Sequence, residues 1–242
     1  MSAPHTARHA PSVPVIAIDG PSASGKGTVA SRVAAQLGFH YLDSGALYRL
    51  TALGARRAGV HLPPVEHAIP PGLEQQLATH AAGLDVRFVG EQIFLAGEEV
   101  SLALRDEQTS REASRVAALG AVRAALLQRQ RDFRVAPGLV TDGRDMATVV
   151  FPDAQVKIFL TASAEERAAR RYKQLIGKGL TANIDDLLRD IHERDQRDAS
   201  RALAPLVQDL RASLLDTTCL TADAAVEEVL RRYHASIDAP CN

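Results

Sequence analysis

The chain has few of the residues that mark disulfide-rich, zinc-binding or membrane-embedded proteins. Its 242 residues include two cysteines, Cys219 and Cys241, and no tryptophan, and the eight histidines contain no H-E-x-x-H pair. Two cysteines are too few for a disulfide framework or a cysteine-based zinc cage, so we expect a reducing compartment and no metal site of clustered protein ligands. No apolar run approaches the roughly 20 residues that span a bilayer, and residues 1–14 lack the apolar centre of a secretory signal. These absences predict a cytoplasmic protein without a membrane partner.

The chain also lacks an excess of charge of either sign. Lys and Arg together number 28, Asp and Glu number 29, and the formal net charge is -1. We therefore expect no nucleic-acid partner, and any site for a polyanion must be local. A hydrophobic share of 46% and a charged share of 24% are ordinary for a globular protein, and the length predicts one domain, or one with an insert. Nothing in the composition requires more than a monomer.

Short apolar runs alternate with helical patterns in two parts of the chain. The patterns predict strands at 13–18, 39–42, 138–141, 156–160 and 214–215, and helices at 26–37, 44–57, 163–178, 183–201 and 224–233. Strands separated by helices are typical of the α/β class, in which a mostly parallel sheet forms the middle of three layers. Ligands of such folds bind at the carboxyl ends of the strands.

The segment over residues 61–133 has a different pattern and predicts an insert. Four prolines fall between residues 63 and 71, residues 84–89 and 92–95 alternate like a hairpin around Gly90 and Glu91, and residues 105–133 show the spacing of two helices. We expect residues 13–242 to form one domain, with a core of 13–60 and 134–235 and with the insert as a small lobe over the ligand edge. Residues 1–12 are expected to be a disordered extension.

A glycine-rich segment lies between the first expected strand and the first expected helix, the context that distinguishes a phosphate-binding loop from a chance match. Glycines allow backbone N–H groups to converge on phosphate oxygens, the helix N-terminus adds partial positive charge, and Lys26 is placed to reach the transferable phosphate of ATP. Gly27 follows the lysine in place of Ser or Thr, so the hydroxyl arrives one position late and is expected to contact phosphate instead of holding Mg²⁺ directly. This variant resembles nucleoside monophosphate kinases of the adenylate kinase type. The expected ATP-binding residues here are Gly20, Pro21, Ser22, Ala23, Ser24, Gly25, Lys26, Gly27 and Thr28.

A phosphate-binding loop alone does not distinguish a kinase from a GTPase, a motor or an ATPase. No lysine stands in the N-K-x-D pattern with which a GTPase reads its base, and the Ser-Gly-Gly signature of ABC-type ATPases is absent. A nucleotide-dependent switch that signals through the insert stays open as an alternative. A nucleic-acid-binding ATPase is a further alternative, which the near-neutral charge disfavours.

Two further motifs follow the second and third expected strands. Residues 43–49 (DSGALYR) open a helix, and residues 142–154 (DGRDMATVVFPDA) follow a buried run. Together with the phosphate-binding loop, these motifs closely resemble the bacterial cytidylate kinases, and the likeness runs from about Val13 to Tyr233. Ala147 departs from the family pattern, which usually has Gly there. Asp142, at a strand end, is expected either to hold a metal-bound water or to cap its loop.

The resemblance implies a P-loop kinase fold, with an insert that contains a small antiparallel sheet and binds the nucleoside monophosphate (NMP), and a helical lid over residues 165–182. It implies an ATP:(d)CMP phosphotransferase that phosphorylates CMP and dCMP with Mg-ATP in pyrimidine nucleotide metabolism. The expected catalytic residues are Lys26, Arg144 and Arg201. The expected substrate-binding residues are Ser44, Arg49, Ser114, Arg123, Arg144, Asp145, Arg194, Asp198 and Arg201. Three arginines share a helix face at the base of the lid, and of Arg167, Arg170 and Arg171 we expect the first and the last to bind ATP.

The chemistry of cytosine fits this assignment. Its exocyclic amine needs an acceptor, and its N3 and O2 need a donor; by resemblance, Asp145 and Ser114 are the acceptors and Arg123 is the donor. Uracil would place its O4 against the Asp145 carboxylate, and a buried mismatch of two acceptors costs about 1–3 kcal/mol or more. We therefore expect CMP to be preferred over UMP, with a kinase for UMP or another small acceptor as the nearest alternative.

Charged residues recur at helical spacing near the end of the helix expected over 183–201, at Arg194, Arg197, Asp198 and Arg201. The spacing alone also fits a solvated face, with pairs between Asp190 and Arg194 and between Glu193 and Arg197. The resemblance favours an anion-binding face. It assigns Arg194 and Asp198 to the ribose and Arg201, with Arg49 and Arg144, to the acceptor phosphate.

Overall fold

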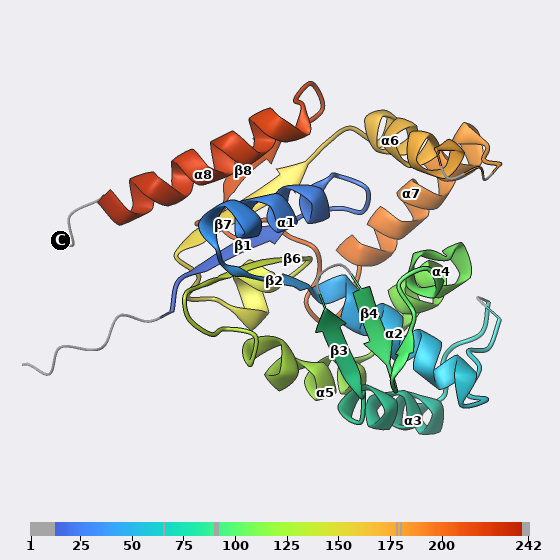
Figure 1. The fold of residues 1–242 in the computed structure, drawn as a ribbon. Helices are drawn as coiled ribbons and strands as arrows, with labels where there is room; N and C mark the ends of the chain where they lie inside the picture. The colour runs from blue at the N-terminus through green and yellow to red at the C-terminus, as the bar shows by residue number, and fades with distance from the viewer. Residues whose placement is uncertain (1–12, 65, 90–91, 178, 180, 239–242) are drawn as a thin grey trace, which may run out of the picture.

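The computed structural model describes residues 13–64, 66–89, 92–177, 179 and 181–238. Its central element is a five-stranded parallel sheet in the order β2-β6-β1-β7-β8 (Figure 1). The strands are β1 (Val15–Asp19), β2 (His40–Asp43), β6 (Leu139–Gly143), β7 (Val156–Thr161) and β8 (Ser213–Asp216). The α/β class predicted from the alternation of strands and helices is confirmed. The expected N-terminal extension over residues 1–12 lies outside the described residues.

Strand β1 is buried on both faces, which explains its unbroken apolar run. Ile16 and Ile18 point to one side, where helices α1 (Lys26–Leu37) and α8 (Ala222–Asp238) pack on the sheet. Val15 and Ala17 point to the other side, which is covered by α2 (Ser44–Arg57) and by helices of the insert. The sheet and the helices packed on its two faces form the three layers that the sequence predicted.

The insert forms a lobe with a sheet of its own. The antiparallel pair of β3 (Val86–Val89) and β4 (Gln92–Leu95) confirms the expected hairpin, whose Gly90 and Glu91 lie outside the described residues, and β5 (Glu98–Glu99) adds a third strand. The two expected helices are α4 (Glu107–Val116) and α5 (Gly120–Arg131), preceded by a 3₁₀ turn, η1 (Ala103–Arg105). Helix α3 (Pro71–Ala82) was not predicted. Its proline-rich start was interpreted as a break, although Pro at the first helical position is favourable because that N–H needs no partner.

The remaining elements complete the core and the region of the expected lid. A single π-helical turn, η2 (Met146–Val150), follows β6; α6 (Ala164–Ile176) and α7 (Ile184–Ala199) follow β7. Asn183 caps α7 through hydrogen bonds from the Asp185 and Asp186 amides, as expected for an Asn at that position. Helix α7 ends at Ala199, so Arg201 lies just beyond the helix that was expected to include it. The domain boundaries and the lid range stay predictions.

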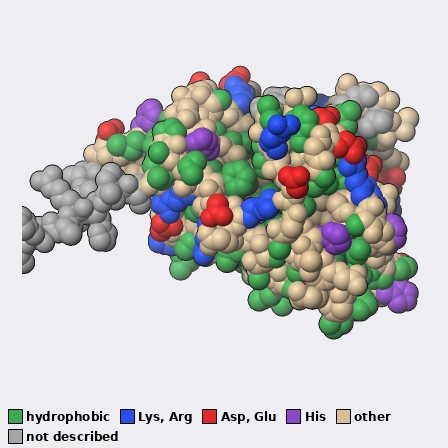
Figure 2. Space-filling model, turned by 60° about the horizontal axis from the view of Figure 1, so that its bottom comes forward, with side chains coloured by type: hydrophobic (Ala, Val, Ile, Leu, Met, Phe, Trp, Pro, Cys, Tyr) green, Lys and Arg blue, Asp and Glu red, His purple; other side chains and the backbone are tan. Residues whose placement is uncertain are grey.

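The surface carries mixed charges. On the face in Figure 2, Lys and Arg side chains lie interspersed with Asp and Glu, and hydrophobic side chains are scattered among them. None of the helices in the described part of the chain is long and apolar enough to cross a membrane.

Candidate active site

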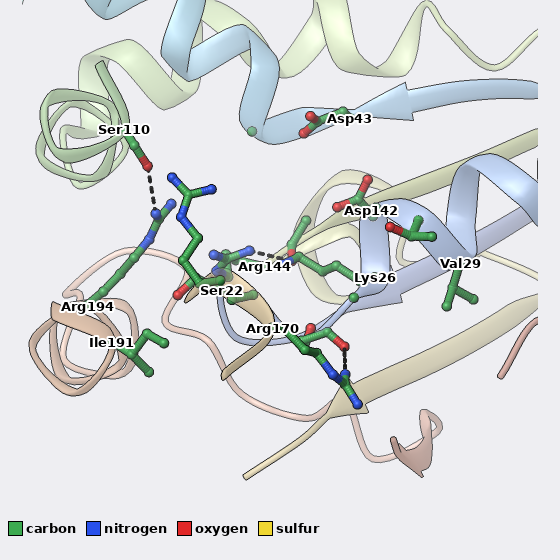
Figure 3. Close-up of a pocket in the computed structure, with 18 of the residues that line it drawn as sticks. Ser22, Lys26, Val29, Asp43, Ser110, Asp142, Arg144, Arg170, Ile191 and Arg194 are labelled. Carbon is green, nitrogen blue, oxygen red and sulfur yellow. Dashed lines mark hydrogen bonds between the residues drawn. The ribbon is translucent and has the colours of Figure 1, made fainter. Parts of the chain in front are cut away.

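A cavity of about 680 Å³ lies at the carboxyl ends of β1, β2 and β6, where the rule for parallel sheets places ligands. Its walls come from the glycine-rich loop, from α2 and α4 on the insert side, and from α6 and α7 on the opposite side. The volume suits small-molecule ligands. In Figure 3, Lys26 and Arg144 point into the same space, and Asp43 and Asp142 lie beside them.

The glycine-rich loop forms the floor of this cavity. Gly20 permits a close approach to the sheet, since a Cβ there would lie 2.0 Å from the Leu160 carbonyl oxygen. Gly25 has φ +93°, a left-handed conformation that glycine adopts freely, directly before α1 begins. Residues 22–28 line the cavity, whereas Gly20 and Pro21, which were also expected to bind ATP, do not. The backbone N–H groups at the start of α1 are thus free to bind phosphate oxygens.

Lys26 is buried in a strongly positive environment. Its ammonium donates to the Pro21 carbonyl oxygen over 2.9 Å. Burial, and next the nearby Arg144, lower the pKa of Lys26 to about 7, against the opposing effect of Asp142. A bound phosphate would favour the protonated lysine, so the site is electrostatically suited to an anion.

Two carboxylates, at the ends of β2 and β6, lie beside the loop. The Tyr41 hydroxyl donates to Oδ1 of Asp142 over 2.7 Å. Burial, and next the charge of Asp43, raise the pKa of Asp142 to about 6. Asp43 caps α2 by accepting from the Ala46 amide at 3.1 Å and also pairs with Arg49. Asp43, Arg49 and Asp142 all line the cavity, so two carboxylates and a guanidinium face it from here.

Arginines gather around one fully buried carboxylate, that of Asp198. Its Oδ2 accepts from Nε of Arg144 at 2.7 Å, and its Oδ1 accepts from Arg201. Burial would raise the pKa of Asp198, but the charges of Arg144 and Arg201 hold it below its usual value. Burial, and then the charge of Arg144, lower the pKa of Arg194 to about 10. Nε of Arg194 and Nε of Arg201 are buried without a hydrogen-bond partner among the described residues, which leaves positive charge and donors for an anionic ligand.

Three side chains predicted to read cytosine meet at the end of the cavity near α4 and α5. Arg123 pairs with Oδ2 of Asp145 and also donates to the Ala117 carbonyl oxygen at 3.1 Å. Burial raises the pKa of Asp145, against the charge of Arg123. The Ser114 hydroxyl is buried and has no hydrogen-bond partner in the described structure. The Arg123 guanidinium lies over the Tyr48 ring, 5.9 Å from its centroid, and Tyr48 also lines the cavity.

The structure separates the three arginines of the expected lid. Arg170 lines the cavity and donates to the Ser24 carbonyl oxygen at 3.1 Å, and Arg171 also lines it. Arg167 lies behind the loop, where it pairs with Asp195 at 2.6 Å and donates to the Ser22 carbonyl oxygen at 3.3 Å. Arg170 is therefore placed to meet a ligand, although we expected that of Arg167. The shared helix face made Arg170 a candidate, but helical spacing could not tell which of the three arginines reaches the cavity.

Two contacts cross the cavity from α4 to the opposite wall. Arg171 of α6 pairs with Glu107, and Arg194 of α7 donates to the Ser110 hydroxyl at 3.0 Å (Figure 3). Neither Glu107 nor Ser110 was predicted, because helical spacing does not say which helix lies opposite. Ser44 was predicted; it is buried beside Gly143, where an added Cβ would lie 2.5 Å from the Ser44 Oγ.

The charged residues of α7 also fitted a solvated helix face, and this interpretation holds only in part. Arg197 pairs with Glu193 at 3.6 Å on the outer side of the helix, as a solvated face would. Arg194 does not follow that pattern, because it turns toward α4 and lines the cavity. The helix therefore divides its arginines between solvent and site.

Comparison with known proteins gives the same family as the motifs. Residues 16–235 match the cytidylate kinase family. A cytidylate kinase of Chromobacterium violaceum is 61% identical over 221 residues, which cover 91% of this chain and 96% of that protein. Cytidylate kinases of Cupriavidus pinatubonensis and Bordetella bronchiseptica are 56% and 55% identical, over 92% of this chain and 97% and 96% of their own lengths. The matched region includes every residue named in this section.

Proposed function

The chain belongs to the cytidylate kinase family, and we propose that it transfers the γ-phosphoryl group of Mg-ATP to the 5′-phosphate of CMP or dCMP, in pyrimidine nucleotide metabolism. The products are ADP and CDP or dCDP. The observation that carries this proposal is that one cavity is lined by two groups of cationic side chains. Lys26 and the loop form one, and the arginines around Asp198 form the other. A nucleotide switch or a simple ATPase has no need of the second.

Transfer in this site depends on bringing two polyanions together. The loop amides and Lys26 bind the ATP phosphates, while Arg49, Arg144 and Arg201 bind the acceptor phosphate. The acceptor phosphate is already anionic at neutral pH, so no strong general base is required. Catalysis then rests on in-line positioning and on stabilisation of the charge that spreads over the transferring group. Arg170 and Arg171 close the ATP side and help to exclude water.

The oxygen donors of the site fit Mg²⁺. This ion keeps several waters and needs only one or two protein oxygens beside the nucleotide phosphates. Asp142, which lines the cavity, would hold one of its waters, while the Thr28 hydroxyl would contact phosphate. Within the described residues no three His, Cys, Asp or Glu side chains form a metal cluster. When bound with ATP, Mg²⁺ neutralises charge on the phosphates.

The base pocket favours cytosine by its hydrogen-bonding pattern. Asp145 and Ser114 offer acceptors to the exocyclic amine, and Arg123 offers a donor to N3 and O2. Arg194, which lines the cavity, would hold the ribose together with Asp198, whose carboxylate lies behind Arg144 and Arg201. The further expectations of a cytoplasmic monomer without nucleic-acid or membrane partners stay predictions.

The proposal is tested by an ADP-release assay with Mg-ATP and CMP, dCMP, UMP, AMP and GMP in turn, with a control that lacks an acceptor. We expect activity largely confined to CMP and dCMP, and its loss in a Lys26→Ala variant. Preference for another acceptor would discard the cytosine pocket but keep the kinase. ADP release that does not depend on an acceptor, or full turnover by the Lys26→Ala variant, would overturn the proposal.

A further inference from the structure

Asp19 is a buried carboxylate that has no part in the mechanism above. It ends β1, directly before Gly20 of the phosphate-binding loop, and only 2% of it is exposed. Its Oδ1 accepts from the Met146 amide at 2.9 Å, and its Oδ2 accepts from the Ala147 amide at 2.8 Å. Both oxygens of the carboxylate therefore hold the backbone directly after Asp145.

The segment held in this way is the π-helical turn η2. The first N–H groups of a helical turn have no partner within the turn, and a carboxylate at that end both accepts from them and opposes their partial positive charge. The next part of the turn closes on Asp145 itself, whose carbonyl oxygen accepts from the amides of Val149 and Val150 at 2.9 and 3.2 Å. Asp145 thus joins the sheet to the turn, and Asp19 binds the backbone amides of the two residues that follow it.

A second charged side chain holds the same turn from the other side. Lys157 of β7 donates to the Ala147 carbonyl oxygen at 2.7 Å and pairs with Asp209 at 3.0 Å. Ala147 is therefore held at both its N–H and its C=O. This is the position where the resembled family usually has glycine, and the structure shows that the backbone, not the side chain, makes these contacts.

We propose that Asp19 is a positioning residue for base recognition: it fixes the turn after Asp145 so that the Asp145 carboxylate points at the base of the acceptor nucleotide. The inference rests on the proposed function, since it takes Asp145 as the group that reads cytosine. Asp19 is not among the residues that line the cavity, so we assign it no direct contact with the nucleotide. It acts through the backbone of residues 145–147, and it connects that backbone to the start of the phosphate-binding loop.

The pair of amides explains why a carboxylate occupies this position. Two parallel N–H donors need two acceptor atoms, and only Asp provides them at this length. Asn offers one acceptor and turns an NH₂ group against the second amide. Burial raises the pKa of Asp19 to about 7 in spite of the two hydrogen bonds, so a charge here is unfavourable for the core alone, and an apolar residue would serve packing better.

The test compares Asp19→Asn, Asp145→Asn and the double variant with the unmodified protein. For each, KM and kcat are measured with CMP, UMP and ATP. We expect Asp19→Asn to raise KM for CMP and to lower the ratio of kcat/KM for CMP to that for UMP by about 10-fold, the effect of one well-placed hydrogen bond, with KM for ATP changed less than about twofold. If Asp19 acts through Asp145, Asp19→Asn has no further effect on this ratio in the Asp145→Asn background.

A matched control is Thr141→Val on β6, which removes a buried hydroxyl that donates to the Leu42 carbonyl oxygen at 3.2 Å. We expect it to lower the melting temperature without changing the CMP to UMP ratio. The inference is overturned if Asp19→Asn behaves in the same way, or if its effect on the ratio adds to that of Asp145→Asn. If Asp145→Asn leaves the ratio unchanged, the cytosine pocket fails, whatever Asp19 does.

Two further measurements apply if Asp19→Asn does not fold. Asp19→Ser is smaller, keeps one acceptor and takes its place in the same kinetic series. In the unmodified protein without nucleotide, hydrogen exchange should show the amides of Met146 and Ala147 strongly protected. Exchange of these amides at the rate of a free loop would overturn the inference.

Discussion

The Tyr41 hydroxyl donates a hydrogen bond to the Asp142 carboxylate over 2.7 Å and so connects β2 to the end of β6 beside the phosphate-binding loop. A Cβ at Gly27 would be 3.6 Å from the Tyr41 oxygen and 3.9 Å from Oδ1 of Asp142. The space after Lys26 is therefore bounded by this pair. Asp142 lines the cavity, so in this protein its carboxylate, and not a hydroxyl at position 27, supplies oxygen atoms at that point.

Removing the Tyr41 hydroxyl should change the pH dependence of the reaction. Burial, and next Asp43, raise the pKa of Asp142 to about 6, while the hydrogen bond from Tyr41 opposes them. In Tyr41→Phe that opposition is lost, the pKa rises further, and the acid limb of kcat moves to higher pH by up to about one unit. The measurement is kcat from pH 5 to 8 at saturating substrates. Tyr233→Phe on α8 serves as the control, and an acid limb that moves equally in both variants would contradict the prediction.

ATP binding should be coupled to proton uptake by Lys26. Burial, and next Arg144, lower the pKa of this lysine to about 7 in the free protein, and a bound phosphate raises it again. At a pH between the pKa values of the free and the ATP-bound lysine, ATP binding takes up a proton. The affinity for ATP therefore falls as pH rises above about 7, by at most tenfold per pH unit. Calorimetry at pH 8 in two buffers of different ionisation enthalpy measures the uptake. Lys26→Arg stays charged, and uptake that persists in that variant would show that another group is responsible.

Replacement of Asp198 should destabilise the protein as well as weaken CMP binding. Asp198→Asn leaves Arg144 and Arg201 buried without their carboxylate, which costs about 3–5 kcal/mol by analogy with other broken buried pairs. Urea unfolding at neutral pH measures the loss. In Asp186→Asn, the control on the same helix, the broken pair with Arg189 is exposed, and the expected change is within about 0.5 kcal/mol. Equal losses in the two variants would contradict the role given to the buried cluster.

The ion pair between Glu107 and Arg171 should weaken the binding of ATP. Both residues line the cavity, and the carboxylate holds a guanidinium that faces the ATP side. Glu107→Gln removes the negative charge and is expected to lower KM for ATP by about two- to fivefold, a partly exposed ion-pair effect, with KM for CMP unchanged. Glu112→Gln is the control, because Glu112 on the same helix pairs with Arg56 and does not line the cavity. A higher KM for ATP in Glu107→Gln would mean instead that the pair holds Arg171 in its binding position.

Local patterns were sufficient to predict the sheet, the phosphate-binding loop and the hairpin. Each of these depends on residues close together in sequence: the apolar run of β1, the glycines before Lys26, and the alternation on either side of Gly90. Helix α3 was missed because the prolines before it looked like a break, when Pro71 in fact begins the helix.

Contacts between distant segments could not be predicted from local patterns. Ser114, Arg123 and Asp145 come from α4, α5 and the turn after β6, and only the family resemblance grouped them. Arg194 meets Ser110 across 84 positions of sequence, and no periodicity specifies such a partner. The role of Asp19 was hidden in a different way, because an Asp at the end of a strand gives no sign of the two amides that it binds.

The position of Tyr48 beneath the Arg123 guanidinium has a spectroscopic consequence. The chain contains no tryptophan and four tyrosines, so its near-ultraviolet emission comes from tyrosine alone. Tyr48 of α2 lines the cavity, whereas Tyr233 of α8 packs against Phe39. A nucleotide that displaces or engages Arg123 alters the surroundings of Tyr48 and leaves those of Tyr233 as they were. The protein therefore contains an intrinsic fluorophore at the proposed base pocket, with which acceptor binding can be followed without any label.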